Sequence, residues 1–138
     1  MGLVLQLRRF GRGLAPVALM LVLAGCENPL ESTTLPATFL MSPGDVAHAK
    51  QATVTFIGVT SDSRCPIDVV CIQAGDVIAV FTVSAAGLDG RYELQLLNPA
   101  KKSVVHRGYT IELMDVRPLP VSGQATPPTA YRATVKVR

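Results

Sequence analysis

Clusters of turn-forming residues divide the chain into short segments of strand length, and this division limits the folds open to it. The clearest segment is Tyr131–Arg138, in which apolar and polar residues alternate with the two-residue period of a half-buried β-strand. We find no convincing helical period after residue 38. The pattern predicts strands at residues 39–41, 46–49, 52–60, 77–83, 91–97, 104–105, 109–116 and 131–138.

About seven short strands at a spacing of about 10 residues favour an all-β fold. We therefore predict an antiparallel Greek-key sandwich, immunoglobulin-like in outline, with a small β-barrel as the alternative. Val77–Val83 is apolar throughout and is predicted to be an interior strand. Gly58 is predicted to mark a β-bulge, and Asp89-Gly90 is predicted to form a two-residue hairpin turn.

The N-terminus has the pattern of a secretory signal. Residues 1–12 contain three arginines and no acidic residue, and Leu14–Ala24 is almost entirely apolar. This apolar segment of about 11 residues is short of the roughly 20 that a membrane-spanning helix needs. Residues 1–25 are therefore predicted to be a signal peptide that is removed.

The end of this segment, Leu23-Ala24-Gly25-Cys26, resembles the lipobox of bacterial lipoproteins. The resemblance implies that a diacylglycerol is attached to the sulfur of Cys26, and that the new N-terminus is acylated with a fatty acid such as palmitate. In a Gram-negative cell, Glu27 in place of aspartate implies the outer membrane, on the side that faces the periplasm. Residues 26–37 are then the lipidated cysteine and a flexible tether, and residues 38–138 form a single domain.

Charge gives no support for binding to nucleic acid. The whole chain has a net charge of +3, from thirteen Lys and Arg and ten Asp and Glu. Because three of the arginines lie in the signal peptide, the mature chain has ten of each sign and a net charge of zero. No basic stripe interleaved with aromatic residues is present in the sequence.

Two cysteines remain once Cys26 is assigned to lipid. In an oxidising compartment, Cys65 and Cys71 are predicted to form a disulfide, which closes a seven-residue ring worth about 2 kcal/mol. A metal site is the alternative, but the spacing is Cys-x5-Cys and not Cys-x2-Cys. A catalytic redox pair is a weaker alternative still, because the Cys-x-x-Cys helix start that lowers a thiol pKa is missing.

The segment around these cysteines resembles a family of small exported bacterial proteins, mostly lipoproteins, whose function is not established. Asp62-Ser63-Arg64-Cys65-Pro66 and Cys71-Ile72-Gln73-Ala74-Gly75 resemble the family pattern Asp-Ser-Arg-Cys-Pro, a variable stretch, then Cys-Ile/Val-Trp-Ala-Gly. The segments "GYTIELMDVRPLP" and "YRATVKV" resemble its closing strands. Gln73 stands where the family has tryptophan. The resemblance implies an architecture and an envelope location, but no activity.

The polar residues of this segment form a candidate binding loop: Asp62, Arg64, Asp68, Gln73 and Asp76. Two of them also have a purely structural interpretation, in which Asp62 caps a turn and Arg64 pairs with a carboxylate. The three aspartates could instead bind calcium, although the Asp-x-Asp-x-Asp-Gly pattern is missing.

Nothing in the sequence indicates catalysis. Neither His48 nor His106 belongs to a motif with a serine or cysteine nucleophile, and no glycine-rich phosphate loop occurs. We therefore predict a non-catalytic, lipid-anchored envelope module without a cofactor or metal, which meets another envelope protein through its loops. The alternatives are a metal or small-ligand carrier that uses His48, His106 or the aspartates, and a hydrolase with an unrecognised site.

Overall fold

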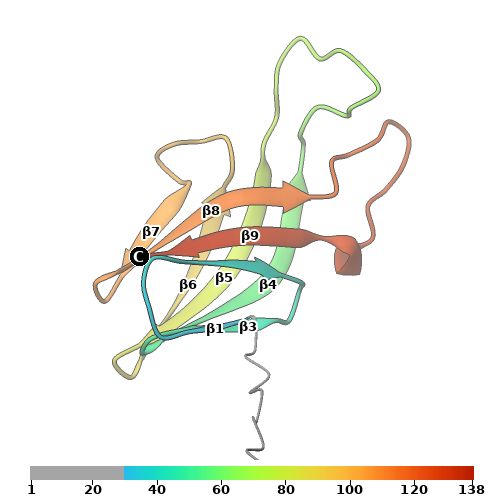
Figure 1. Cartoon of the computed structure of the whole chain (residues 1–138). Helices are drawn as coiled ribbons and strands as arrows, with labels where there is room; N and C mark the ends of the chain where they lie inside the picture. The colour runs from blue at the N-terminus through green and yellow to red at the C-terminus, as the bar shows by residue number, and fades with distance from the viewer. Residues whose placement is uncertain (1–29) are drawn as a thin grey trace, which may run out of the picture.

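The structure, a computed structural model, describes residues 30–138 (Figure 1). The predicted signal peptide and Cys26 lie outside these residues. The described part contains one short 3-10 turn, η1 (Pro128–Ala130), and no α-helix. Its strands are β1 (Glu31–Ser32), β2 (Ala37–Met41), β3 (Val46–Ala49), β4 (Ala52–Asp62), β5 (Val77–Ala85), β6 (Leu88–Gln95), β7 (Ser103–His106), β8 (Tyr109–Arg117) and β9 (Arg132–Val137).

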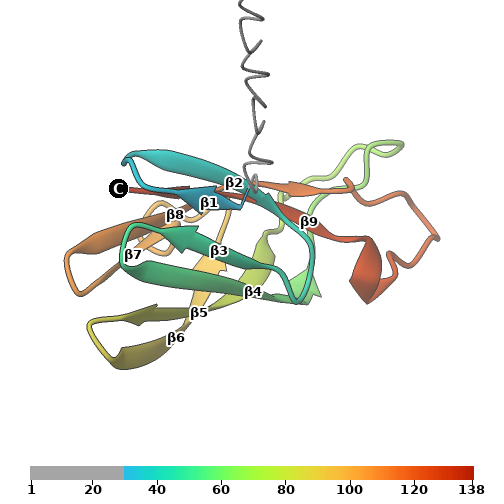
Figure 2. The same ribbon diagram turned by 60° about the horizontal axis from the view of Figure 1, so that its bottom comes forward.

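The strands form two sheets that pack face to face. One sheet has the order β1-β3-β4-β5-β6, and the other has the order β2-β9-β8-β7. All neighbours are antiparallel except β1 and β3, which are parallel. Figure 2 shows the two layers, with β3 to β6 on one side and β2, β9 and β8 on the other. Because neither sheet closes on itself, the predicted β-sandwich is confirmed and the barrel alternative is excluded.

The core lies between the sheets and follows the alternation in the sequence. Ala133, Val135 and Val137 of β9 are buried, as the two-residue period predicts. Phe56 of β4 and Phe81 of β5 stack with their ring centroids 5.1 Å apart. β5 lies between β4 and β6, which confirms the predicted interior strand.

The position of one hairpin turn was predicted incorrectly. The turn between β5 and β6 is Ala86-Gly87, and Asp89 and Gly90 lie inside β6. Both turn residues have positive φ, 52° for Ala86 and 73° for Gly87, as a two-residue turn of the primed type requires. Gly87 satisfies this requirement without a steric penalty, and the two-residue turn then places Ala85 opposite Leu88.

The ordered part begins before the predicted boundary at residue 38. Glu31 and Ser32 pair with His48 and Ala49 of β3, and Leu30 packs against the core. The prediction of a flexible tether is therefore wrong from residue 30 onward. The physical reason is that a two-residue strand can cover part of the exposed edge of β3, even though its sequence has no visible period.

β4 and β5 are the long strands that carry the loop discussed below. The predicted bulge at Gly58 is confirmed by a shift in register between Phe56 and Gly58. Pairing then continues to Asp62 and Val77, at the far end of β4 from β1. At about 3.3 Å per residue, roughly 30 Å of strand separates the β1 end of the sheet from Asp62.

His106 also has a structural position in the sandwich. It is buried at the end of β7, where Nε2 lies 3.1 Å from the carbonyl oxygen of Leu88 and Nδ1 lies 2.8 Å from the hydroxyl of Tyr92. Because a carbonyl can only accept, Nε2 donates to the Leu88 oxygen, and Nδ1 is hydrogen-bonded to the Tyr92 hydroxyl. His106 therefore links the two sheets.

Candidate functional site

The most distinctive site is the cysteine loop (residues 63–76), which connects β4 to β5. Its base is closed by Ser63 and Asp76: the Ser63 N–H donates to the Asp76 carbonyl at 2.8 Å, and the Asp76 N–H donates to Ser63 Oγ at 3.1 Å. Gly75 passes so close to Ser63 that a Cβ would lie 1.8 Å from the Ser63 carbonyl oxygen. The loop therefore leaves the sheet through a tight neck that only glycine fits.

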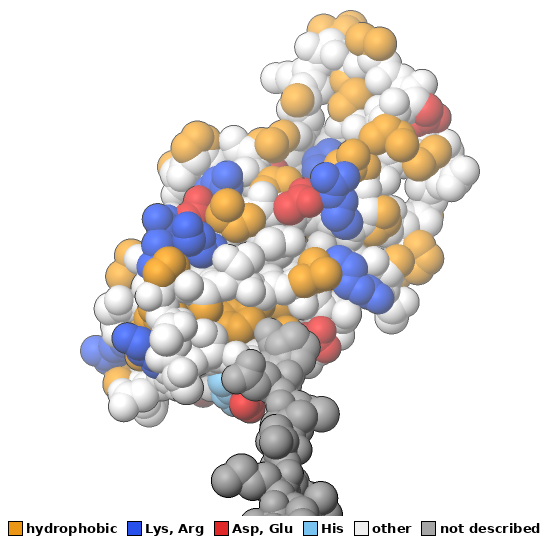
Figure 3. Space-filling view, in the orientation of Figure 1, with side chains coloured by type: hydrophobic (Ala, Val, Ile, Leu, Met, Phe, Trp, Pro, Cys, Tyr) orange, Lys and Arg blue, Asp and Glu red, His pale blue; other side chains and the backbone are white. Residues whose placement is uncertain are grey.

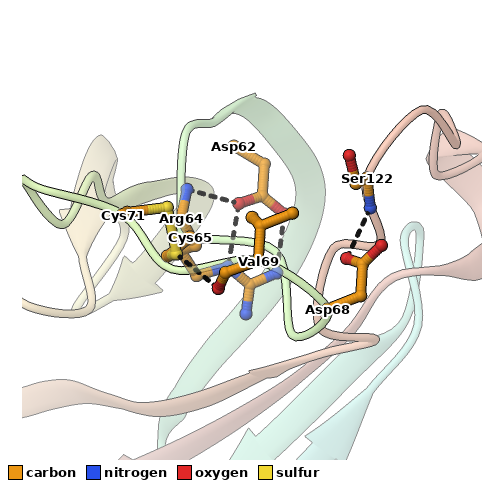
Figure 4. Close-up of a disulfide and its surroundings, with 7 residues drawn as sticks. All are labelled: Asp62, Arg64, Cys65, Asp68, Val69, Cys71 and Ser122. Atoms are coloured by element: carbon orange, nitrogen blue, oxygen red, sulfur yellow. Dashed lines mark hydrogen bonds and ion pairs between the residues drawn. A yellow bond between two sulfur atoms is a disulfide. The ribbon is translucent and has the colours of Figure 1, made fainter.

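The disulfide between Cys65 and Cys71 is present in the structure (Figure 4). The two Cα atoms are 5.9 Å apart, within the usual range for a bridge. Cys65 Sγ lies 3.6 Å from the carbonyl oxygen of Val69, which is a contact and not a hydrogen bond, because a disulfide sulfur has no proton. The bridge ties the tip of the loop to its first half.

Arg64 is the main internal anchor of this loop. Its side chain is buried, donates to both carboxylate oxygens of Asp62 at 2.8 and 2.6 Å, and reaches the carbonyl oxygens of Val116 at 2.6 Å and Pro118 at 2.8 Å. Asp62 also accepts the backbone N–H of Arg64 at 3.3 Å. The predicted turn cap and ion pair are thus both observed, and they join the cysteine loop to the end of β8.

Electrostatics stabilise this pair in its charged form. Burial raises the pKa of the Asp62 carboxyl, but the hydrogen bonds and charge of Arg64 outweigh it, so that this pKa lies below its usual value. The hydrogen bond to Asp62 likewise raises the pKa of Arg64. Tyr131 donates its hydroxyl proton to Asp62 Oδ2 at 3.2 Å, and burial followed by the charge of Asp62 raises the pKa of Tyr131.

A second set of bonds joins the cysteine loop to the proline loop (residues 118–128), which links β8 to β9. The Ile67 N–H donates to the Pro120 carbonyl at 3.0 Å, and the Ser122 N–H donates to Asp68 Oδ1 at 2.8 Å (Figure 4). Figure 1 shows the two loops at the same end of the sandwich. They therefore form one docked pair and not two independent loops.

Asp76, the third aspartate of the predicted binding loop, also has a structural role. Its carboxylate accepts backbone N–H groups from Val77 at 2.7 Å, Leu97 at 3.0 Å and Asn98 at 3.1 Å, which fixes the turn after β6. Asp62, Asp68 and Asp76 thus serve three separate sets of partners and do not converge on a common point.

The other predicted site residues are not brought together. His48 is exposed in β3 and lies 3.4 Å from the Thr53 hydroxyl, whereas His106 is in the opposite sheet. Gln73 is exposed and forms no hydrogen bond within residues 30–138. No group of three or more His, Cys, Asp or Glu side chains in the described part of the chain is arranged to hold a metal ion.

The apolar residues of the cysteine loop are its most unusual feature, and sequence analysis did not single them out. We call four of them the apolar tip: Ile67, Val69, Val70 and Ile72. Val70 and Ile72 are fully exposed, and Ile67 is 65% exposed. Figure 3 shows apolar side chains on the part of the molecule that projects beyond the sandwich. Nearby in the proline loop, Leu119 is also exposed.

Fold and site together define a β-sandwich that displays a disulfide-closed apolar loop at one end. Comparisons with family models, with curated proteins and with solved structures found no match to this chain. Within residues 30–138, no helix combines the length and the apolar character needed to cross a membrane.

Proposed function

We propose that this chain is a lipid-anchored protein of the bacterial envelope and a non-catalytic binding module that engages its target through the apolar tip. The observation that carries the proposal is the exposure of Ile67, Val69, Val70 and Ile72 in one loop. Soluble proteins rarely display such side chains together unless they form an interaction site. The resemblance to exported bacterial lipoproteins belongs to the same proposal, with Cys26 as the anchor and, in a Gram-negative cell, the periplasmic side of the outer membrane as the location.

The position of the tip supports this role. Three residues lie between Cys26 and Leu30, and the four Cα–Cα steps from one to the other can span about 14 Å at most. β1 lies beside the start of β4, whereas the cysteine loop follows the end of β4, roughly 30 Å away along the strand. β1 and the cysteine loop thus lie at opposite ends of the sandwich (Figure 1). Because Cys26 is only a few residues before β1, an anchor there leaves the tip accessible.

The charged residues in the cysteine loop and at the end of β4 support a role without catalysis. Asp62, Arg64 and Asp76 are used in bonds that hold the loop and its neighbours in place. A pocket of about 240 Å³ lies elsewhere, beside β6 and the start of β7. Ser103 and Glu93 are among its lining residues, but no hydrogen bond joins these two side chains. Neither the carrier alternative nor the hydrolase alternative gains support from the described residues.

A fluorescent amino acid whose emission shifts to the blue in apolar surroundings tests the binding role. We would place it at position 70 and, as a control, at position 40, because Leu40 is an exposed aliphatic residue of β2. Emission from position 70 should shift to the blue in intact cells relative to the purified Cys26→Ser protein, and emission from position 40 should not. If the spectrum from position 70 is the same in intact cells and in the purified protein, the proposal is refuted.

A further inference from the structure

The chemistry of the apolar tip specifies its partner more closely. We propose that the tip is recognised by a protein that offers an apolar pocket together with hydrogen-bonding groups, and not by a lipid bilayer. This inference rests on the proposed binding role and adds the class of partner. Three features of the tip support this inference: its side chains are exposed on an ordered loop, its backbone groups from Val70 to Ala74 form no hydrogen bonds with other described residues, and it has no positive charge.

The disulfide determines which side chains are available. Cys71 is bonded to Cys65, and the residues on either side of it, Val70 and Ile72, are both fully exposed. The first half of the loop is held by Ile67 and Asp68 against the proline loop. Val70 and Ile72 are therefore displayed on a loop that is ordered before it binds, which reduces the entropy cost of recognition.

The backbone beside these side chains is not hydrogen-bonded. From Val70 to Ala74, no N–H or C=O group forms a hydrogen bond with another described residue. In the hydrocarbon of a bilayer such groups have no partners at all, so the loss of their hydrogen bonds to water opposes insertion of the apolar tip. A protein pocket can supply donors and acceptors to the same groups while it buries Val70 and Ile72.

The charge of the tip also disfavours a membrane. Between Cys65 and Ala74 the single charged side chain is Asp68, and its carboxylate accepts the Ser122 N–H. Loops and helices that bind a membrane surface commonly combine apolar residues with Lys or Arg, which are attracted to anionic lipids. This segment contains no Lys, Arg or aromatic residue, so it suits an uncharged apolar pocket.

Site-specific photo-crosslinking in the bacterium that makes the protein tests this inference. A photoreactive amino acid is placed in the full chain at position 70 or 72, and, as matched controls, at Leu40 and Val105, which are exposed aliphatic residues of the other sheet. We expect a discrete protein adduct from positions 70 and 72 alone, with the crosslink mapped to apolar residues of the partner. With the photoreactive group at position 67, V70S/I72S should reduce the adduct by about tenfold or more.

Flotation with vesicles of phosphatidylethanolamine and phosphatidylglycerol is the second arm. The Cys26→Ser protein, which lacks the lipid anchor, should remain unbound, with or without V70S/I72S. Lipid adducts, flotation that V70S/I72S abolishes, an adduct of two copies of this chain, or equal adducts from all four positions would each overturn the inference. If the fluorescence at position 70 shifts to the blue but the crosslinks are to lipid, the binding role stands and the inference of a protein partner is refuted. If the fluorescence does not shift, the binding role itself is refuted.

Discussion

Single residues of the cysteine loop divide into those that hold it and those that it displays. Asp62 and Arg64 are two positions apart, so the sequence could predict that they pair. It could not predict that Arg64 also reaches the carbonyl groups of Val116 and Pro118, more than 50 positions away, because this contact depends on how the sheets pack. The polar residues were predicted to form a binding site, yet the charged side chains of Asp62, Arg64, Asp68 and Asp76 all bind the protein's own chain.

The Asp62–Arg64 pair predicts how stability changes in acid. Because the pKa of Asp62 in the folded protein lies below its unfolded value of about 3.9, its contribution is complete above about pH 5 and declines as the pH falls through the folded pKa. Asp62→Asn should remove this part of the pH dependence. Denaturant unfolding at several pH values between about 6 and 2 measures it. Parallel curves for the two proteins would contradict the assignment.

Strands were predicted better than the turns and loops that join them. The alternation in 131–138 depends only on which face is buried, so the sequence carries it directly. Asp89-Gly90 also has a strong turn signal, but the pairing of Ser84 with Asp89 and of Val83 with Gly90 extends the ladder past it to Ala85 and Leu88. The uninterrupted backbone pairing of β5 with β6 outweighs a local turn preference.

The exposure of the apolar tip could be predicted from the sequence only in part. The sequence places four aliphatic residues within six positions, between two cysteines or next to them. A seven-residue ring is too small to fold over such side chains, and this signal could have identified them as exposed. Their exposure also depends on the docking of Ile67 and Asp68 against the proline loop, which local sequence does not specify.

The whole molecule combines a proposed anchor at one end with a displayed loop at the other. Cys26→Ser should release the protein from membranes, because the acyl chains, at about 0.8 kcal/mol per buried CH₂, supply the attachment. Fractionation of cells followed by a carbonate wash measures the release, with Cys71→Ser as the control for loss of a cysteine elsewhere. Continued membrane association of Cys26→Ser would contradict the lipid anchor.

The central claim is that the charged residues hold the loop while the apolar tip is displayed for binding, and equilibrium unfolding of the purified Cys26→Ser protein tests it most directly. V70S/I72S should change the free energy of unfolding by no more than about 0.5 kcal/mol, as for surface positions. Asp62→Ala should lower it by about 3–5 kcal/mol, because Arg64 is left buried without its counter-charge. A loss in V70S/I72S as large as in Asp62→Ala would show that the tip is structural, and would contradict the account.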